Sequence, residues 1–249
     1  MRAMSQGIPK SVEKRGIRRW LPVLAIALGA ALFFAFGLQR YLSLEALRTN
    51  RDWLYWQVAD HLFLVLASYL LIYAGVVALS LPGATVLSLA GGCMFGQWLG
   101  TGTTILAATL GATLLFLAAR TAFADLLRAR AGPWLARMSD GFRANAFNYL
   151  LFLRLVPAFP FFVVNLVPAF LDVPLGTFVL ATLIGIVPGT FVYSTAGAGL
   201  KELIYSDAPI SLDRVLSPQI LTAMAGLALL SLLPVAYKAW RRAKDGTGR

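Results

Sequence analysis

Long uncharged runs are the dominant pattern along this chain of 249 residues. Residues 20–38 carry no charge and would rise about 28 Å as a helix, enough to cross a bilayer. A much longer run, residues 62–119, contains no Asp, Glu, Lys or Arg. Two spans of about 20 residues account for only part of it, and the remainder is too short to leave the membrane, cross again and return. This run therefore predicts an additional segment inside the membrane.

Proline and glycine are concentrated in the middle of the long run. They occupy Pro82, Gly83, Gly91, Gly92, Gly96, Gly100 and Gly102. Both residue types break helices, and broken backbone at membrane depth is tolerated only where it is buried in protein or lines a wet cavity. We therefore expect a re-entrant hairpin at 82–99 and a full span at 101–119.

The same pattern recurs in residues 144–200, which carry only two charges, Arg154 and Asp172. This part opens with three prolines, Pro157, Pro160 and Pro168. They predict a second re-entrant hairpin at 147–171, and the apolar run at 175–196 predicts the span that follows. Two halves that each contain a broken helix and a full span are typical of transporters with inverted repeats.

The predicted fold is therefore an all-α polytopic membrane protein with flanking spans. Its membrane domain occupies residues 62–200. Residues 1–61 form a basic N-terminus, a first span and an interfacial loop. Residues 201–249 form a polar loop, a last span at 218–237 and a basic tail.

Composition supports this class and excludes others. The chain is 59% hydrophobic and 13% charged, with a mean hydropathy of +0.73, whereas soluble domains are about 45–50% apolar and about 25% charged. Soluble enzymes and nucleic-acid binders are therefore not expected, despite a net charge of +11. The only cysteine is Cys93 and the only histidine is His61, so we expect no disulfide, no metal site, no cofactor and no catalytic activity.

The charge distribution leaves the topology open. Both ends of the chain are basic, and the positive-inside rule then predicts that both lie in the cytoplasm. Five spans with two hairpins would put them on opposite sides. Either residues 146–171 cross the bilayer completely or one predicted span, such as 20–38, does not. The N-terminal apolar run is too long for a cleaved signal, which favours the inner membrane of a bacterium.

Arg154 is the sharpest single candidate for a functional residue. A charge near the bilayer centre costs about 2.5–3.5 kcal/mol on insertion scales. Its side chain could instead snorkel to the headgroups. The alternative that we favour is that Arg154 faces a wet cavity and binds a phosphate or carboxylate, which a guanidinium contacts through two hydrogen bonds. Pro157 and Pro160 would free backbone carbonyls beside it, and Asn165 would satisfy such groups or contact the ligand.

Other residues are assigned to structure rather than binding. Gly92, Gly96 and Gly100, and Gly185 with Gly189, have the spacing that lets helices approach closely. Asp172 is expected at the membrane interface rather than in proton transfer. Residues 120–145 would form either an amphipathic helix on anionic headgroups or a solvated linker.

Two groups of residues resemble a known family. The first comprises Pro82-Gly83, Gly91-Gly92, Phe95-Gly96, Gly111-Ala112 and Arg120. The second comprises Arg154, Pro157, Pro160, Asn165, Gly185, Pro188-Gly189-Thr190, Tyr193 and Gly197. Together they resemble the VTT domain of the SNARE-associated Golgi protein family, within the DedA superfamily. The resemblance covers roughly residues 75–200 and implies two facing re-entrant hairpins.

The resemblance also implies a function. Relatives in this superfamily are associated with moving lipids between leaflets, including phospholipid scrambling and recycling of polyprenyl phosphate carriers. Members of the DedA type carry acidic residues in the first hairpin and a second arginine in the other. This chain has no acid in 82–99 and no arginine in 161–164, so proton coupling is not expected.

The functional hypothesis is therefore a protein that translocates or scrambles lipids, with anionic headgroups as partners and Arg154 as the phosphate ligand. An ion or small-solute transporter is one alternative, although coupling to ions usually employs carboxylates. A scaffold without transport activity is another.

Overall fold

A computed structural model describes residues 11–41, 43–130, 145–155 and 161–205, together with residues 218, 222, 225 and 226. All of its regular elements in these ranges are helical. They are α1 (Ser11–Ala35), the 3-10 helix η1 (Leu38–Tyr41), α2 (Leu44–Thr49), α3 (Arg51–Asp60), α4 (Leu62–Ala78), α5 (Ala84–Arg130), α7 (Ala146–Leu155), α8 (Phe161–Phe170), α9 (Leu175–Gly185) and α10 (Val187–Tyr205). The all-α prediction is confirmed for this part of the chain.

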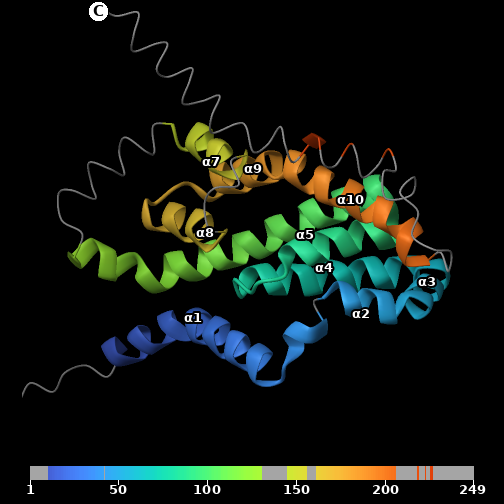
Figure 1. Ribbon diagram of the computed structural model, residues 1–249. Helices are drawn as coiled ribbons and strands as arrows, with labels where there is room; N and C mark the ends of the chain where they lie inside the picture. Colours follow the sequence, from blue (N-terminus) through green and yellow to red (C-terminus); the bar gives the residue numbers. More distant parts are fainter. Residues whose placement is uncertain are drawn as a thin grey trace, which may run out of the picture.

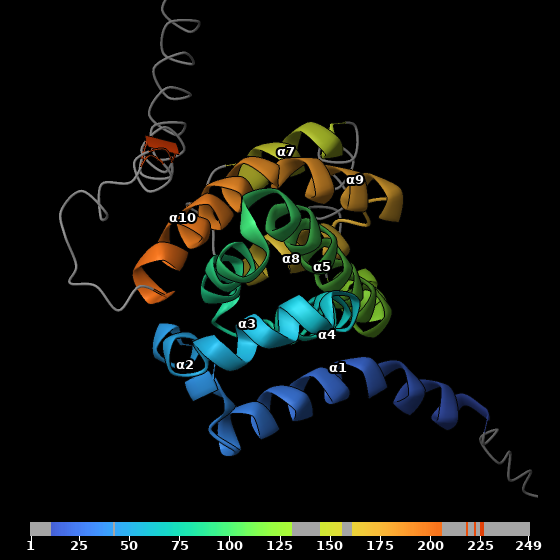
Figure 2. The same ribbon diagram turned by 90° about the vertical axis from the view of Figure 1, so that its right-hand side faces the viewer.

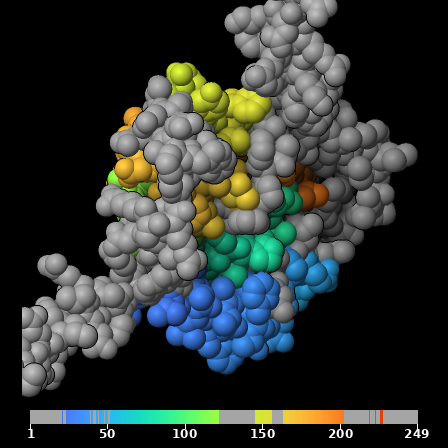
Figure 3. All heavy atoms as spheres, turned by 90° about the vertical axis from the view of Figure 1, so that its left-hand side faces the viewer, coloured from blue at the N-terminus to red at the C-terminus, as the bar shows by residue number. Residues whose placement is uncertain are grey.

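The helices form layers around α5. Figures 1 and 2 show α9 and α10 on one side of α5 and α4 on the other, with α1 forming a further layer outside α4. The space-filling view of one face also shows α1 as an outer layer at one edge of the molecule (Figure 3). α1 nevertheless contacts the inner helices, because Phe33 is buried and Gly29 lies against the side chain of Leu79.

α5 is interrupted at Gly96, where the chain turns back on itself. Gly96 has φ 78° and ψ 176°, a conformation that side chains other than glycine disfavour. The Tyr69 hydroxyl donates to the carbonyl oxygen of Leu87 at 2.9 Å and lies 2.6 Å from Thr104 Oγ1. These two partners would be about 25 Å apart along a straight helix. Residues 84–95 and 97–130 are therefore two arms packed side by side, and the break falls within the predicted segment 82–99.

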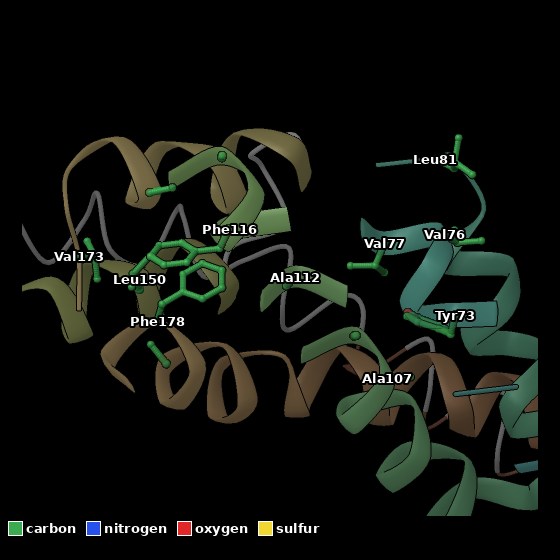
Figure 4. Close-up of a cluster of buried hydrophobic side chains, with 14 of the residues drawn as sticks. Tyr73, Val76, Val77, Leu81, Ala107, Ala112, Phe116, Leu150, Val173 and Phe178 are labelled. Carbon is green, nitrogen blue, oxygen red and sulfur yellow. The ribbon is translucent and has the colours of Figure 1, made fainter. Parts of the chain in front are cut away.

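The inner core fills the space between α5 and its neighbours. Phe116 of α5 and Phe178 of α9 are fully buried, and their rings stack with centroids 4.3 Å apart. Figure 4 shows Leu150 and Val173 beside this pair, while Val77 lies on the other side of Ala112. Many large apolar side chains remain on the outside, among them Phe63 at 88% exposure. An apolar core and an apolar exterior together are typical of a protein surrounded by lipid.

The number of membrane spans differs from the prediction. Within the described residues, Ala84–Thr121 and Leu175–Lys201 are long and apolar enough to cross a bilayer, and the pair Asp52–Asp60 and Leu62–Ala78, bent by 116°, would make a third. The runs at 101–119 and 175–196 lie within the first two. The predicted span 218–237 lies almost entirely outside the described residues.

Local backbone determines where two of the predicted spans end. α1 (Ser11–Ala35) contains residues 20–35 of the run 20–38 and ends just before Gly37, where the chain turns with φ 64°. α4 ends at Ala78, since Ser80 adopts φ 54° and Pro82 follows. The prediction of five full spans is therefore not confirmed.

The helix boundaries bear on two further expectations. Residues 120–145 were expected to form an amphipathic helix or a solvated linker, and the backbone of α5 is helical through Arg120 to Arg130. Residues 131–144 lie outside the described residues. The run 175–196 was expected to be unbroken, but α9 ends at Gly185 and α10 begins at Val187. Pro188 explains this interruption, because it has no N–H to donate to the preceding turn.

Candidate functional site

Arg154 lies at the C-terminal end of α7 and is held by side chains from two other helices. Its Nη2 donates to Asn165 Oδ1 of α8 at 2.7 Å and to Thr182 Oγ1 of α9 at 2.9 Å. The guanidinium carbon lies 5.4 Å from the centroid of the Phe178 ring, within the range of a cation–π contact. Arg154 is therefore oriented by the protein rather than extended toward the surface. We call Arg154, Asn165, Thr182 and Phe178 the arginine cluster.

Short, closely packed helices bring this cluster together. The described parts of α7 and α8 have ten residues each, so each rises about 15 Å. Close approach of α7 to α9 depends on Gly185, because a Cβ there would lie 2.6 Å from Arg154 Cβ. Phe178 is fixed by its stacking on Phe116. The cluster thus rests on three helices and on the aromatic core.

The cluster has hydrogen-bond donors left over and no negative charge. Asn165 is fully buried and turns its oxygen to Arg154, as expected because a guanidinium only donates. Arg154 Nε and Asn165 Nδ2 are buried and have no hydrogen-bond partner in the part of the chain that the structure describes. Among the described residues, no carboxylate forms an ion pair with Arg154. A buried charge is costly unless it is paired, so this arrangement is chemically suited to an anion with several acceptor oxygens, such as a phosphate.

Asp172 forms an ion pair outside the arginine cluster. It accepts a hydrogen bond from Arg120 Nη2 at 2.9 Å, in an ion pair whose side chains are 38% and 47% exposed. It also adopts φ 53° at the end of α8, where Val173 N donates to Pro168 O. This is the usual left-handed ending of a helix. An ion pair of this exposure agrees with the expectation that Asp172 is not a buried proton carrier.

The other predicted residues are placed as follows. Gly92 lies against the backbone of Ser194 and Gly91 lies against the Tyr69 hydroxyl, so both permit close packing. Pro82 and Gly83 form the turn before α5, Gly96 forms the break within it, Pro188 lies in the first turn of α10, and Gly189 has open space at its Cβ position. Pro157 and Pro160 lie outside the described residues. Of the glycines with the spacing for close helix approach, Gly92 and Gly100 lie against neighbouring backbone, whereas Gly96 forms the turn.

Sequence reasoning missed Thr182 and Phe178. Both lie in the apolar run after the second proline-rich segment, and neither residue type is unusual in a helix. Among the described residues, no group of three or more His, Cys, Asp or Glu side chains could hold a metal ion.

Comparison with known proteins identifies a domain family and several relatives. Residues 81–199 match the VTT domain. The transmembrane protein 41 homolog of Dictyostelium discoideum is 36% identical over 178 residues, which make up 70% of this chain and 52% of that protein. Transmembrane protein 41B of Danio rerio is 30% identical over 70% of this chain and 61% of its own length. The Homo sapiens protein of that name is 28% identical over 70% of this chain and 59% of its own length.

The chain thus spans about half to three fifths of the length of these curated relatives. No solved structure is a significant match. The matched segment, residues 81–199, contains both the turn at Gly96 and the arginine cluster. This chain is therefore an integral, multi-pass membrane protein that belongs to the VTT-domain family, together with the transmembrane protein 41 relatives.

Proposed function

We propose that this protein moves phosphate-bearing lipids between the two leaflets of its membrane, with the arginine cluster as the headgroup site. One observation carries the proposal: a guanidinium held inside the protein has no carboxylate partner among the described residues, while Arg154 Nε and Asn165 Nδ2 remain unpaired. A lipid phosphate supplies both the missing charge and the missing acceptors. Pro157 and Pro160 are proposed to free carbonyls beside it.

The proposed route runs between two re-entrant hairpins. The first is formed by the arms of α5 on either side of Gly96, and the second by α7 and α8. Buried hydroxyl groups support a polar route through the interior, since Thr104, Thr109 and Ser194 are all buried in or against α5. Thr109 Oγ1 and Ser194 Oγ have no hydrogen-bond partner within the described ranges, so both are available to a passing headgroup.

In this proposal the protein transports lipid without catalysing a reaction and without coupling to ion movement. The first arm of α5 contains no carboxylate that could carry a proton. Anionic headgroups are the proposed partners. The basic segments next to the predicted first and last spans support a bacterial inner membrane with both ends in the cytoplasm, although the relatives named above come from eukaryotes.

Leaflet exchange in liposomes tests this function. The wild-type protein should accelerate exchange of a fluorescent phospholipid relative to protein-free vesicles, read as the fraction that dithionite reduces over time. Arg154→Gln should lower the rate at least about tenfold, because a hydrogen bond to a charged group contributes about 1.5–3 kcal/mol.

Arg120→Gln is the matched control for the loss of one arginine. It removes a half-exposed charge from a pair with Asp172, outside the arginine cluster, and should keep most of the activity because exposed ion pairs contribute little. If the well-folded Arg154→Gln protein exchanges lipid at the wild-type rate, the arginine cluster does not carry the headgroup.

A further inference from the structure

A separate cavity of about 100 Å³ lies between α3, α5 and α10. It lies beside the turn at Gly96, because Cys93 and Met94 belong to the last turn of the first arm of α5. The lining residues are Leu54, Tyr55, Val58, Ala59, Cys93, Met94 and Lys201. Lys201 is the charged residue among these seven, and the other six are uncharged and mostly apolar.

Lys201 gives the cavity a single positive charge. Its side chain makes no hydrogen bond or ion pair with any side chain that the structure describes. A lysine stem can lie along apolar walls while its ammonium group reaches toward water. Apolar walls with one free cation suit a ligand that is itself amphipathic and negatively charged, rather than a small hydrophilic anion.

The cavity and the arginine cluster lie near opposite ends of one candidate span. That span is Leu175–Lys201, and Thr182 of the arginine cluster precedes Lys201 by about 28 Å of helix. The hydrocarbon core of a bilayer is about 30 Å thick. Figures 1 and 2 show α3 beside the C-terminal end of α10, whereas α7 and α9 lie at the other end. The two cations are therefore positioned for headgroups of different leaflets.

Exposed aromatic residues lie on α3, which forms one wall of the cavity, and directly after the turn at Gly96. Trp53 and Trp56 of α3 are each 63% exposed, and Trp98, directly after the turn at Gly96, is 78% exposed. Tyr55 lines the cavity and is half exposed. Tryptophan and tyrosine gather at the depth of the lipid headgroups. The aromatic residues of α3 therefore favour headgroup depth for the α3 wall of the cavity.

We infer that this cavity binds the phosphate headgroup of an anionic lipid from the leaflet opposite the arginine cluster. The assignment to that leaflet rests on the proposed function, whereas lipid binding at the cavity does not. In this arrangement Lys201 contacts the phosphate and the α3 wall contacts the glycerol and upper acyl chain. The protein then has one headgroup site near each face.

Preferential quenching by an anionic lipid tests this inference at equilibrium, without any leaflet exchange. The protein would carry a bimane label at Ala59→Cys in a Cys93→Ala background, reconstituted with phosphatidylglycerol or phosphatidylcholine spin-labelled at acyl carbon 5. Phosphatidylglycerol should quench the label more strongly at equal mole fraction. Lys201→Gln should lower this preference about fivefold, the usual effect of one basic residue near a membrane surface. Lys201→Arg should retain it.

Arg40→Gln removes an exposed charge that does not line the cavity and should leave the preference unchanged, as should Arg154→Gln. An absent preference, or one that survives Lys201→Gln, overturns the inference even where exchange depends on Arg154. A preference that excess inorganic phosphate removes also overturns it, because the site would then bind free anions. If instead exchange fails while a Lys201-dependent preference persists, the proposed function falls and lipid binding at the cavity stands.

Discussion

Gly92→Ala is expected to lower the free energy of unfolding by at least about 3 kcal/mol, near or above the upper end of what overpacking usually costs. A Cβ at Gly92 would lie 2.0 Å from the carbonyl oxygen of Ser194. Backbone on both sides prevents relief by a rotamer change, so α5 and α10 must separate. Gly197 makes the reciprocal contact with Leu89 O, also at 2.0 Å. In detergent, the thermal midpoint should fall by at least about 6 °C.

Gly102→Ala is the matched control on the same helix. Nothing lies within 4 Å of its Cβ position, and alanine stabilises a helix interior by up to about 1 kcal/mol relative to glycine. The two substitutions should therefore change the midpoint in opposite directions. Equal midpoints for Gly92→Ala and the wild type would show that α5 and α10 do not cross at this point.

Asn165→Asp is expected to stop leaflet exchange while preserving the fold. The new carboxylate would take the position of Asn165 Oδ1, 2.7 Å from Arg154 Nη2, and would neutralise the guanidinium. A lipid phosphate would then have to displace a buried ion pair, and breaking such a pair costs about 3–5 kcal/mol. The exchange rate should fall more than about hundredfold, a larger loss than for Arg154→Gln, and the thermal midpoint should not decrease.

Asn148→Asp controls for the added negative charge. Asn148 is exposed on α7, the helix that carries Arg154, so the variant has the same net charge with an intact arginine cluster. We expect its exchange rate to remain within about twofold of the wild type, because exposed charges interact weakly. Rapid exchange by a folded Asn165→Asp protein would mean that Arg154 does not need an external anion.

The sequence predicted the membrane class and the segment in which α5 is broken, because the length of an uncharged run limits what it can do in a bilayer. It did not identify which glycine forms the turn. Gly91, Gly92 and Gly96 are equivalent in composition, yet only Gly96 has a positive φ, while Gly92 permits a helix crossing. That difference depends on where α10 lies, which local sequence does not encode.

The candidate site was predictable only in part. Arg154 and Asn165 are unusual in apolar segments, because burying a charged or amide side chain costs free energy. The sequence alone therefore identified both as candidate site residues. Thr182 carried no such signal, because threonines in these helices commonly donate to the carbonyl four residues earlier, as Thr101, Thr103 and Thr195 do. Its contact with Arg154 depends on packing between helices separated by 28 residues in sequence.

Span counting failed for a related reason. Hydropathy measures the length of an apolar run, whereas a helix ends where the backbone changes direction. Ser80 and Gly37 provide such changes, with φ 54° and φ 64°. Apolar length alone therefore does not give the residues at which these helices end.

The central claim is that Arg154 recognises a phosphate inside the protein. Its most direct test compares exchange of two fluorescent lipids with the same acyl chains, a phospholipid and a neutral glycolipid without phosphate, in the wild type and in Arg154→Gln. The account predicts that the wild type accelerates the phospholipid at least about tenfold more and that Arg154→Gln abolishes this difference. Equal acceleration of both lipids by the wild type would contradict it.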